Sequence, residues 1–278
     1  MNNTLLNISG KIDQESLAIY AAVKNAATEL DIPFLVVGAS ARDLVLHYGY
    51  GARIKRATAD IDFGIQISDW NSFNLLRDAL IKAGFTETRS THRLISPHNK
   101  IVDIVPFGSI EDENANITWP PEGKVTMNVL GFTEALENSV QVRLQDKPEM
   151  DIPVAMPPGL SLLKIVAWMD RDTDLRSKDA KDLLFLLKSY EEIPDVVEEI
   201  YEYPDIMEQY DWDITSSSAF LLGKHTKDIA TQATANKLSD IFNQPEILVE
   251  EMCEDIEQEF ERNNALLTAY INGLNYKN

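Results

Sequence analysis

The sequence predicts an α+β protein, with a mixed sheet and flanking helices in residues 1–156 and an all-helical domain in residues 157–278. Two observations lead to this fold class. Before residue 156, strand-type stretches alternate with stretches of helical spacing. The run Pro157-Pro-Gly159 then interrupts the chain, and the apolar spacing after it is helical. We therefore expect a domain boundary near residue 157.

In the first half, strand signals are short apolar runs or alternation of polar and apolar residues. They occur at 34–38, 60–67, 86–95, 100–107, 140–144 and 152–156. Apolar residues three or four positions apart predict helices at 14–30, 40–48 and 70–83. Residues 96–99 are expected to form a turn and residues 118–123 a loop.

In the second half, the same helical spacing predicts four helices. They cover residues 160–169, 178–190, 215–236 and 245–272.

The composition favours a globular cytoplasmic protein. The apolar share is 44%, and no apolar run is long enough to cross a membrane, so no membrane partner is expected. The N-terminus lacks the basic start and apolar stretch of a secretory signal. The single cysteine, Cys253, excludes an internal disulfide.

The formal charge of −20 disfavours broad, sequence-independent nucleic-acid binding, because a negative field repels phosphates. Residues 1–156 carry 14 basic and 20 acidic side chains, and residues 157–278 carry 11 and 25. Residues 189–223 hold ten acids and no Lys or Arg. This segment is either a solvated helical surface or a docking face for a basic partner.

A candidate phosphate-binding turn lies at Gly38-Ala-Ser40. An apolar strand runs into Gly38, and a helix is expected to start near Ser40. The free N–H groups at such a helix start suit a triphosphate, and Gly38 permits a close approach of the backbone. An ordinary turn with Ser40 as N-cap is the alternative.

Two carboxylates follow on the next predicted strand. Asp60 and Asp62 are two positions apart, so they point to one side of the strand, while Ile61 and Phe63 point to the other. Carboxylates so placed repel each other unless a cation compensates, and Mg²⁺ prefers such oxygen ligands.

A third carboxylate, Asp103, interrupts the apolar strand 100–107. A lone carboxylate there is costly unless it lies at a sheet end or is paired. If its strand lies beside the Asp60 strand, three acids meet at one site. Two bridging metals and an aligned nucleophile are what phosphoryl-type transfer needs.

The order Gly38-Ala-Ser40, then Asp60-Ile-Asp62, resembles the G-[GS]…D-x-D signature of the polymerase-β nucleotidyltransferase superfamily, with Asp103 in the place of its third carboxylate. Residues 56–63 resemble the R-x-T-x-D-[IL]-D-[FL] segment of AbiEii-like toxin nucleotidyltransferases, which adds Arg56 to the candidate site.

A second match lies in the helical half. The run from Lys164 through Arg171 to Lys178, Asp179 and Asp182 resembles the K-x2-A…R…[RK]-D-x2-D helix pair of the same family. A lysine near a triphosphate neutralises its charge, and the two aspartates, three apart on one helical face, orient that lysine or bind ribose or metal. The alternative is a mesh of surface ion pairs.

These resemblances imply an enzyme that moves a nucleotide from an NTP to an acceptor, using a two-metal Mg²⁺ site. They imply that Asp60, Asp62 and Asp103 bind metal and that Lys164 joins them in catalysis. They further imply a toxin of a toxin–antitoxin or phage-defence system, with tRNA or another RNA as acceptor and a cognate antitoxin as partner.

One departure concerns residues 38–46, which also resemble the G-G-x-V-R-D-L-L-L opening of the CCA-adding and poly(A) polymerase branch and so make Arg42 a candidate. That branch's R-R-D-F-T-x-N motif is not found downstream, which favours the toxin-like branch.

Two other functions stay open. One is a nucleotidyltransferase that modifies a small molecule, as antibiotic-modifying enzymes do, or a protein. The other is a degenerate nucleotide-binding module.

Overall fold

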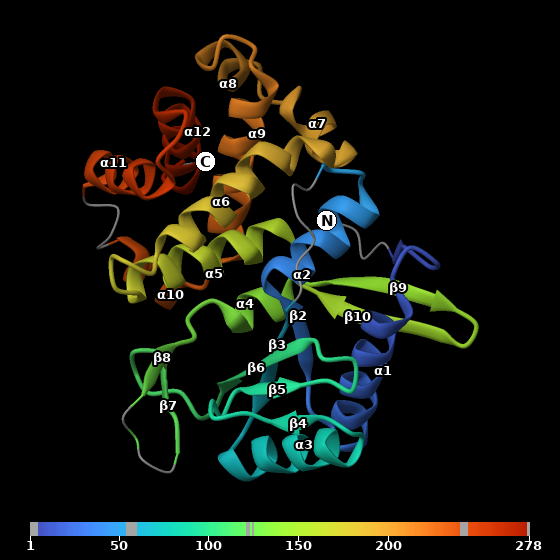
Figure 1. The fold of residues 1–278 in the computed structure, drawn as a ribbon. Coiled ribbons are helices and arrows are strands. Elements are labelled where there is room, and N and C mark those ends of the chain that lie inside the picture. Colours follow the sequence, from blue (N-terminus) through green and yellow to red (C-terminus); the bar gives the residue numbers. More distant parts are fainter. Residues whose placement is uncertain (1–4, 54–59, 121–122, 124, 240–243, 277–278) are drawn as a thin grey trace. The chain divides into compact units, whose positions relative to one another are not determined.

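The computed structural model describes residues 5–53, 60–120, 123, 125–239 and 244–276. The chain divides into two compact units (Figure 1). The first comprises Met1–Gly49 and Arg53–Met156, and the second comprises Tyr50–Ala52 and Pro157–Asn278. Within the described residues, no helix combines the length and the apolar character that a membrane crossing requires.

The first unit is built on a mixed sheet in the order β1-β9-β10-β2-β3-β6-β5-β4, which confirms the predicted fold class. At its centre, β3 pairs in parallel with β6 and antiparallel with β2. The strands are β1 (Leu6–Asn7), β2 (Phe34–Val37), β3 (Ile61–Ile67), β4 (Thr86–Glu87), β5 (Arg93–Ile95), β6 (Ile101–Gly108), β9 (Val140–Asp146) and β10 (Glu149–Val154).

One face of β3 is the core of this unit. Alternate residues from Ile61 to Ile67 are buried there, as the predicted alternation requires. The helices α1 (Gln14–Glu29) and α3 (Trp70–Lys82) contact each other beside the sheet, and Tyr20 of α1 packs its ring edge-on against Phe63. On the other face, Gly64 is buried beside Phe107 and Phe132, and the polar residues Asp62 and Gln66 lie on either side of it.

The chain leaves β2 directly into a helix. α2 (Gly38–Arg42) begins two residues earlier than predicted and continues as a π-helical segment over Asp43–Gly49. Such wider turns are rare and occur frequently at functional sites.

The prediction of one strand over residues 86–95 is wrong, because β4 and β5 are separate. Between them the Thr88 hydroxyl donates to the Arg93 carbonyl, and the Arg93 N–H donates to the Ser90 carbonyl. These bonds close the turn of a hairpin in which β4 and β5 pair antiparallel. Residues 116–137 also contain elements that were not predicted, namely β7 (Asn116–Thr118), β8 (Thr126–Asn128) and α4 (Phe132–Glu137).

The second unit is helical, and two predicted helices are each divided. The Thr231 hydroxyl caps a new helix, and left-handed backbone at Glu257 and Glu259 ends one helix and starts another. The helices are α5 (Pro157–Asp170), α6 (Ser177–Ser189), α7 (Pro194–Ile200), α8 (Pro204–Gln209), α9 (Ile214–Ile229), α10 (Gln232–Ser239), α11 (Pro245–Ile256) and α12 (Phe260–Leu274).

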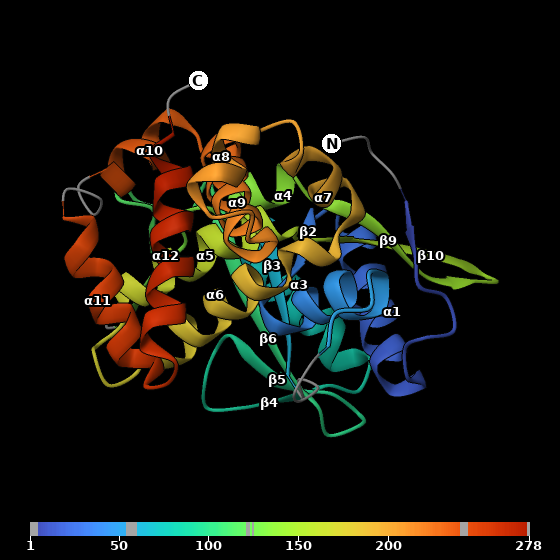
Figure 2. The same cartoon turned by 90° about the horizontal axis from the view of Figure 1, so that it is seen from above.

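The helices α9 and α12 lie side by side (Figure 2). Glycines make this contact possible. A Cβ on Gly223 would lie 2.0 Å from the Tyr270 carbonyl oxygen, and one on Gly273 would lie 2.0 Å from that of Phe220. The two backbones therefore pack directly against each other.

Candidate active site

Two of the predicted aspartates meet on neighbouring strands. Asp62 of β3 and Asp103 of β6 are register partners in a parallel pair, so both side chains leave the same face of the sheet. Asp60 comes two positions earlier, immediately before β3, and is half-buried. The structure thus brings the three carboxylates to one end of the two central strands.

Gly38 provides the space that Asp62 occupies. Val37 pairs with Asp62 across β2 and β3, and Gly38 follows with a left-handed φ of 66°. A Cβ at Gly38 would lie 2.2 Å from Oδ2 of Asp62, well inside van der Waals contact. The close approach expected at this glycine is therefore made by a carboxylate. A phosphate contact of Gly38 remains a prediction.

The Ser40 hydroxyl faces the interior, and the residue is only 3% exposed. It donates to the Val37 carbonyl at 3.1 Å and accepts a long bond, 3.4 Å, from the Asp62 N–H. Burial raises the pKa of the neighbouring Tyr20 phenol, which hydrogen-bonds to Ser40 and stays neutral. Ser40 thus links α2 to the strand that carries Asp62, and its predicted phosphate contact remains a prediction.

Arg42 lies against its neighbour. Its Nε donates to Oδ1 of Asp43 at 2.9 Å, and Asp43 is buried at the start of the π-helical segment. This guanidinium therefore holds α2 to the turn that follows. Arg56, the other predicted arginine, lies outside the described residues.

Arg93, which the sequence did not suggest, occupies the carboxylate cluster. It faces Asp103 across β5 and β6, and its Nε and Nη2 donate to the two Asp103 oxygens at 2.7 and 2.6 Å. These hydrogen bonds raise the pKa of Arg93, partial burial opposes the rise, and the charges of Asp60 and Asp62 add to it. The turn predicted at residues 96–99 brings the two strands together, but the register that sets Arg93 opposite Asp103 depends on the geometry of that turn.

The donor set suits a divalent cation. Carboxylate oxygens on one face are the ligands that Mg²⁺ prefers, and Gly38 leaves room for the Asp62 carboxylate. In the described parts of the chain, no three His, Cys, Asp or Glu side chains are already grouped closely enough to hold an ion. That Asp60, Asp62 and Asp103 together hold a metal ion therefore stays a prediction.

A second group of predicted residues meets in the helical unit. The Lys164 ammonium on α5 contacts Oδ1 of Asp179 at 2.9 Å and Oδ2 of Asp182 at 2.6 Å, both on α6. Asp179 is fully buried and also accepts from Arg171. Burial alone would lower the pKa of Lys164, but the two carboxylates outweigh it and raise this pKa.

Asp179 and Asp182 therefore orient Lys164, which is one of the two roles considered for them from the sequence. Lys164 remains protonated at neutral pH and is held in one position by two acceptors. Binding of ribose or metal by Asp179 and Asp182 stays a prediction. The carboxylate cluster lies in the first unit and the Lys164 group in the second.

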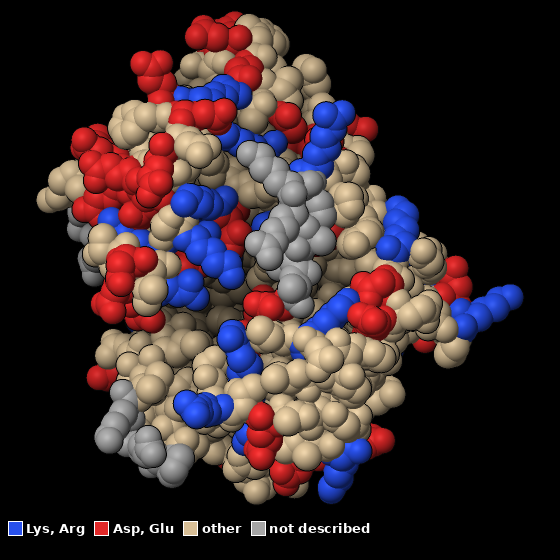
Figure 3. Space-filling view, viewed as in Figure 1, with Lys and Arg blue, Asp and Glu red and all other residues tan. Residues whose placement is uncertain are grey.

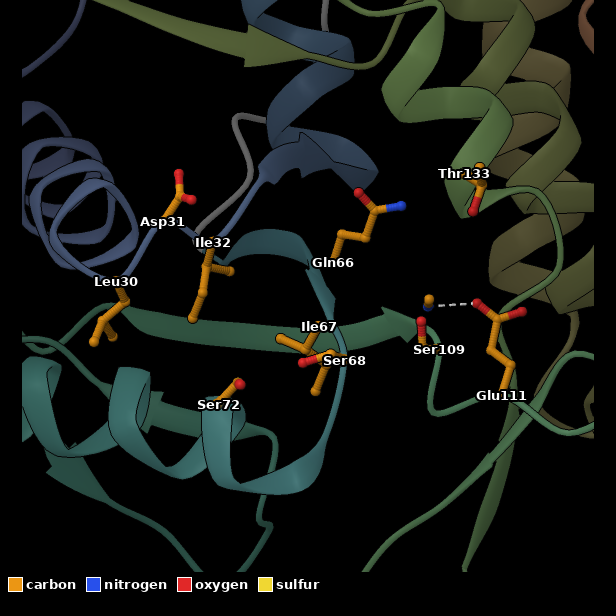
Figure 4. A pocket seen from close by; sticks show the side chains of 11 residues that line it. Leu30, Asp31, Ile32, Gln66, Ile67, Ser68, Ser72, Ser109, Glu111 and Thr133 are labelled. Atoms are coloured by element: carbon orange, nitrogen blue, oxygen red, sulfur yellow. Dashed lines mark hydrogen bonds between the residues drawn. The ribbon is translucent and has the colours of Figure 1, made fainter.

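A polar hollow of about 610 Å³ lies elsewhere in the first unit (Figure 4). It is found where β3 and β6 end, at Ile67 and Gly108, about 16 Å along the strand from Asp62. Its polar lining includes Asp31 and Glu111, and the Glu111 carboxylate accepts from the Gly108 N–H at 2.6 Å. The hollow is separate from the carboxylate cluster.

The surface of the second unit is strongly acidic in places. Acidic side chains gather over α11, whose twelve residues include five acids and no Lys or Arg (Figure 3). The start of α6 is mixed in charge, because the exposed cations Arg171, Lys178 and Lys181 lie close in sequence to the exposed acids Asp170, Asp172 and Asp174.

Solved structures of two enzymes are among those similar to the chain. Two are of ANT(2″)-Ia, one a crystal structure in complex with adenylyl-2″-tobramycin and one a solution structure of this antibiotic-resistance factor. Both are 12% identical with a TM-score of 0.37, and the matches cover 62% and 72% of this chain and 87% and 98% of theirs. The Thermotoga maritima CCA-adding enzyme complexed with tRNA is 12% identical, with coverage of 94% and 80% and a TM-score of 0.29.

No curated protein matches the sequence. The family model described as "Nucleotidyl transferase AbiEii toxin, Type IV TA system" matches residues 22–251, which include every predicted site residue. The chain is thus an enzyme that transfers nucleotides, and it belongs to the AbiEii nucleotidyltransferase toxin family.

Proposed function

We propose that the protein transfers a nucleotide from an NTP to a hydroxyl acceptor in a Mg²⁺-dependent reaction that releases pyrophosphate. The observation that carries this proposal is the register pairing of Asp62 with Asp103, with Asp60 two positions before Asp62 and Gly38 making room for the Asp62 carboxylate. Three carboxylates on one sheet face fit the metal requirement of nucleotidyl transfer.

Each of the three aspartates would have its own role in nucleotide transfer. Asp60 and Asp62 would supply ligand oxygens. Asp103 would share one metal ion with them and would help to activate the acceptor hydroxyl by taking up its proton. The acceptor oxygen bonds to the α-phosphorus, and the bond from that phosphorus to the bridging oxygen breaks, so pyrophosphate leaves. When bound, divalent ions would neutralise the triphosphate and align the two oxygens.

Lys164 would contribute a fixed positive charge to triphosphate binding. Its contacts with Asp179 and Asp182 keep it protonated, and a lysine ammonium is a compact point charge suited to phosphate oxygens. In the first unit, Gly38 and Arg42 would contact the nucleotide beside the carboxylates, and Ser40 would position Asp62.

We propose an RNA acceptor, with tRNA as the main candidate, and a toxin role controlled by a cognate antitoxin. A toxin that transfers nucleotides must modify an acceptor on which the cell depends, and an RNA hydroxyl meets that condition in the cytoplasm, where NTPs are available. The exposed cations Lys178 and Lys181 offer contacts for a phosphate backbone in an otherwise acidic unit.

A cationic small molecule or a protein is the second candidate acceptor. The formal charge of −20 favours it, because such a field attracts cations and repels polyanions.

The test is incubation of the purified protein with each α-labelled NTP, Mg²⁺ and a set of acceptors, namely total RNA, an aminoglycoside and cell protein. Asp62→Asn is expected to lower transfer by roughly a thousandfold, because a metal-binding oxygen is lost. Asp78→Asn is the matched control, since Asp78 is an exposed carboxylate on α3.

The labelled acceptor decides between the two candidates. Label in RNA supports the first, and label on the aminoglycoside or on protein supports the second. Equal transfer by wild type and Asp62→Asn contradicts the proposed site.

A further inference from the structure

The Arg93–Asp103 pair places a cation among the three carboxylates. Both Asp103 oxygens are engaged by one guanidinium, at 2.7 and 2.6 Å, in the planar fork geometry that binds a carboxylate most strongly. The two residues are also register partners, so β5 and β6 hold this geometry from the backbone.

This pair differs from an ordinary surface ion pair. The Asp103 side chain is only 14% exposed, whereas Glu87, which pairs with Arg77 in the same unit, is 58% exposed. Nearby Asp62 leaves the same sheet face as Asp103. Neighbouring carboxylates with little solvent repel one another, and a cation between them offsets that repulsion.

A divalent ion and Arg93 would perform the same electrostatic task at the same oxygens. Asp103 cannot offer both oxygens to a guanidinium and also bind a metal with full strength. Occupation of the site by one cation therefore opposes occupation by the other.

We propose that Arg93 is the resident counter-ion of the carboxylate cluster, which competes with the divalent metal for Asp103 and thereby sets the metal affinity of the enzyme. The proposal rests on the metal-dependent function proposed above. Arg93 is a positioning residue, since it acts through Asp103. Its removal is expected to tighten metal binding, whereas loss of a merely structural arginine would weaken it.

The test is a Mn²⁺ titration of the full chain without nucleotide, in which electron paramagnetic resonance measures free Mn²⁺. Arg93→Gln is expected to bind Mn²⁺ about tenfold more tightly than wild type, which corresponds to about 1.4 kcal/mol. Arg93→Lys keeps the positive charge but cannot donate two parallel hydrogen bonds to Asp103. Its affinity for Mn²⁺ is expected to lie between those of wild type and Arg93→Gln. Arg77→Gln is the matched control and is expected to bind as wild type does.

Circular dichroism establishes whether each variant is folded. If Arg93→Gln does not fold, the comparison is made with Arg93→Lys instead. Unchanged or weaker Mn²⁺ binding by the folded Arg93 variants overturns the counter-ion role. If wild type binds Mn²⁺ and Asp62→Asn does not, the metal site itself stands, so only the role of Arg93 is rejected. Absence of binding in wild type and in every Arg93 variant rejects the metal site and the counter-ion together.

Discussion

Gly38 shows how one residue makes the carboxylate arrangement possible. Its left-handed backbone brings α2 out of β2, and its missing side chain leaves the space in which the Asp62 carboxylate lies. Both requirements point to glycine, because other residues adopt this conformation at a cost and also carry a Cβ.

Gly38→Ala is therefore expected to reduce nucleotide transfer at least about a hundredfold, by displacing a metal-binding carboxylate. Gly10→Ala is the control, because Gly10 has a similar φ of 77° but has no atom within 4 Å of its Cβ position. Both variants carry the backbone cost of roughly 1 kcal/mol in urea unfolding. Equal activity in the two alanine variants would contradict the role of Gly38.

For single residues, the sequence indicates which ones are candidates for the site better than it indicates which residues they contact. Asp60, Asp62 and Asp103 stand out because charged residues interrupt apolar strands, and the structure places Asp62 and Asp103 opposite each other on β3 and β6. Arg93 does not stand out, because the predicted turn at 96–99 brings it near Asp103 but does not fix the register, and a shift of one residue would turn Arg93 to the other face. The inward direction of the Ser40 hydroxyl is likewise decided by Tyr20 and Asp62, which are distant in sequence.

At the scale of elements, periodicity predicts where helices and strands occur but not where they break. Residues 245–272 have continuous helical spacing, yet Glu257 and Glu259 take left-handed backbone that glycine usually occupies. The strand 86–95 is divided by hydrogen bonds of Thr88 and Ser90, residues that also occur in unbroken strands. Left-handed backbone in the helix and a hydrogen-bonded turn in the strand thus interrupt patterns that the apolar spacing continues.

At the contact between α9 and α12, close packing and helix propensity predict opposite changes in stability for the same substitution. Propensity alone predicts that Gly223→Ala stabilises α9 by about 1 kcal/mol. The 2.0 Å approach to the Tyr270 carbonyl predicts the reverse, a loss of about 3 kcal/mol or more, because one helix must move. Thermal and urea unfolding measure the change.

Thr268→Ala, on the exposed side of α12, is the control for that measurement and is expected to alter stability by less than about 1 kcal/mol. A stabilised Gly223→Ala protein would show that the two helices do not touch as closely as described.

At the scale of the whole molecule, the net charge of −20 opposes compactness. Like charges repel one another within the folded chain, and the helical unit carries most of the excess. Local ion pairs such as those of Lys164 offset only part of this repulsion. The overall charge is fully predictable from the sequence, but its distribution over surfaces such as that of α11 needs the fold.

Added salt is therefore expected to stabilise the protein. Raising NaCl from about 20 to 300 mM shortens the screening length to below 10 Å and should raise the unfolding midpoint by about 3–6 °C. KCl at the same concentrations serves as the control, because screening does not depend on the cation. A constant or falling midpoint would mean that attraction between opposite charges already outweighs the repulsion.

The segment Tyr50–Ala52 has a consequence for how this gene can be rearranged. These three residues belong with the helical unit although they lie inside the sequence of the sheet-bearing unit. The chain thus passes between the units three times, and no single cut separates them. Burial raises the pKa of Tyr50, and Asp195 of α7 adds to the rise, which places this tyrosine among the helices. A recombination event at residue 157 would leave Tyr50 without its neighbours, so the two units are expected to be inherited together rather than exchanged as modules.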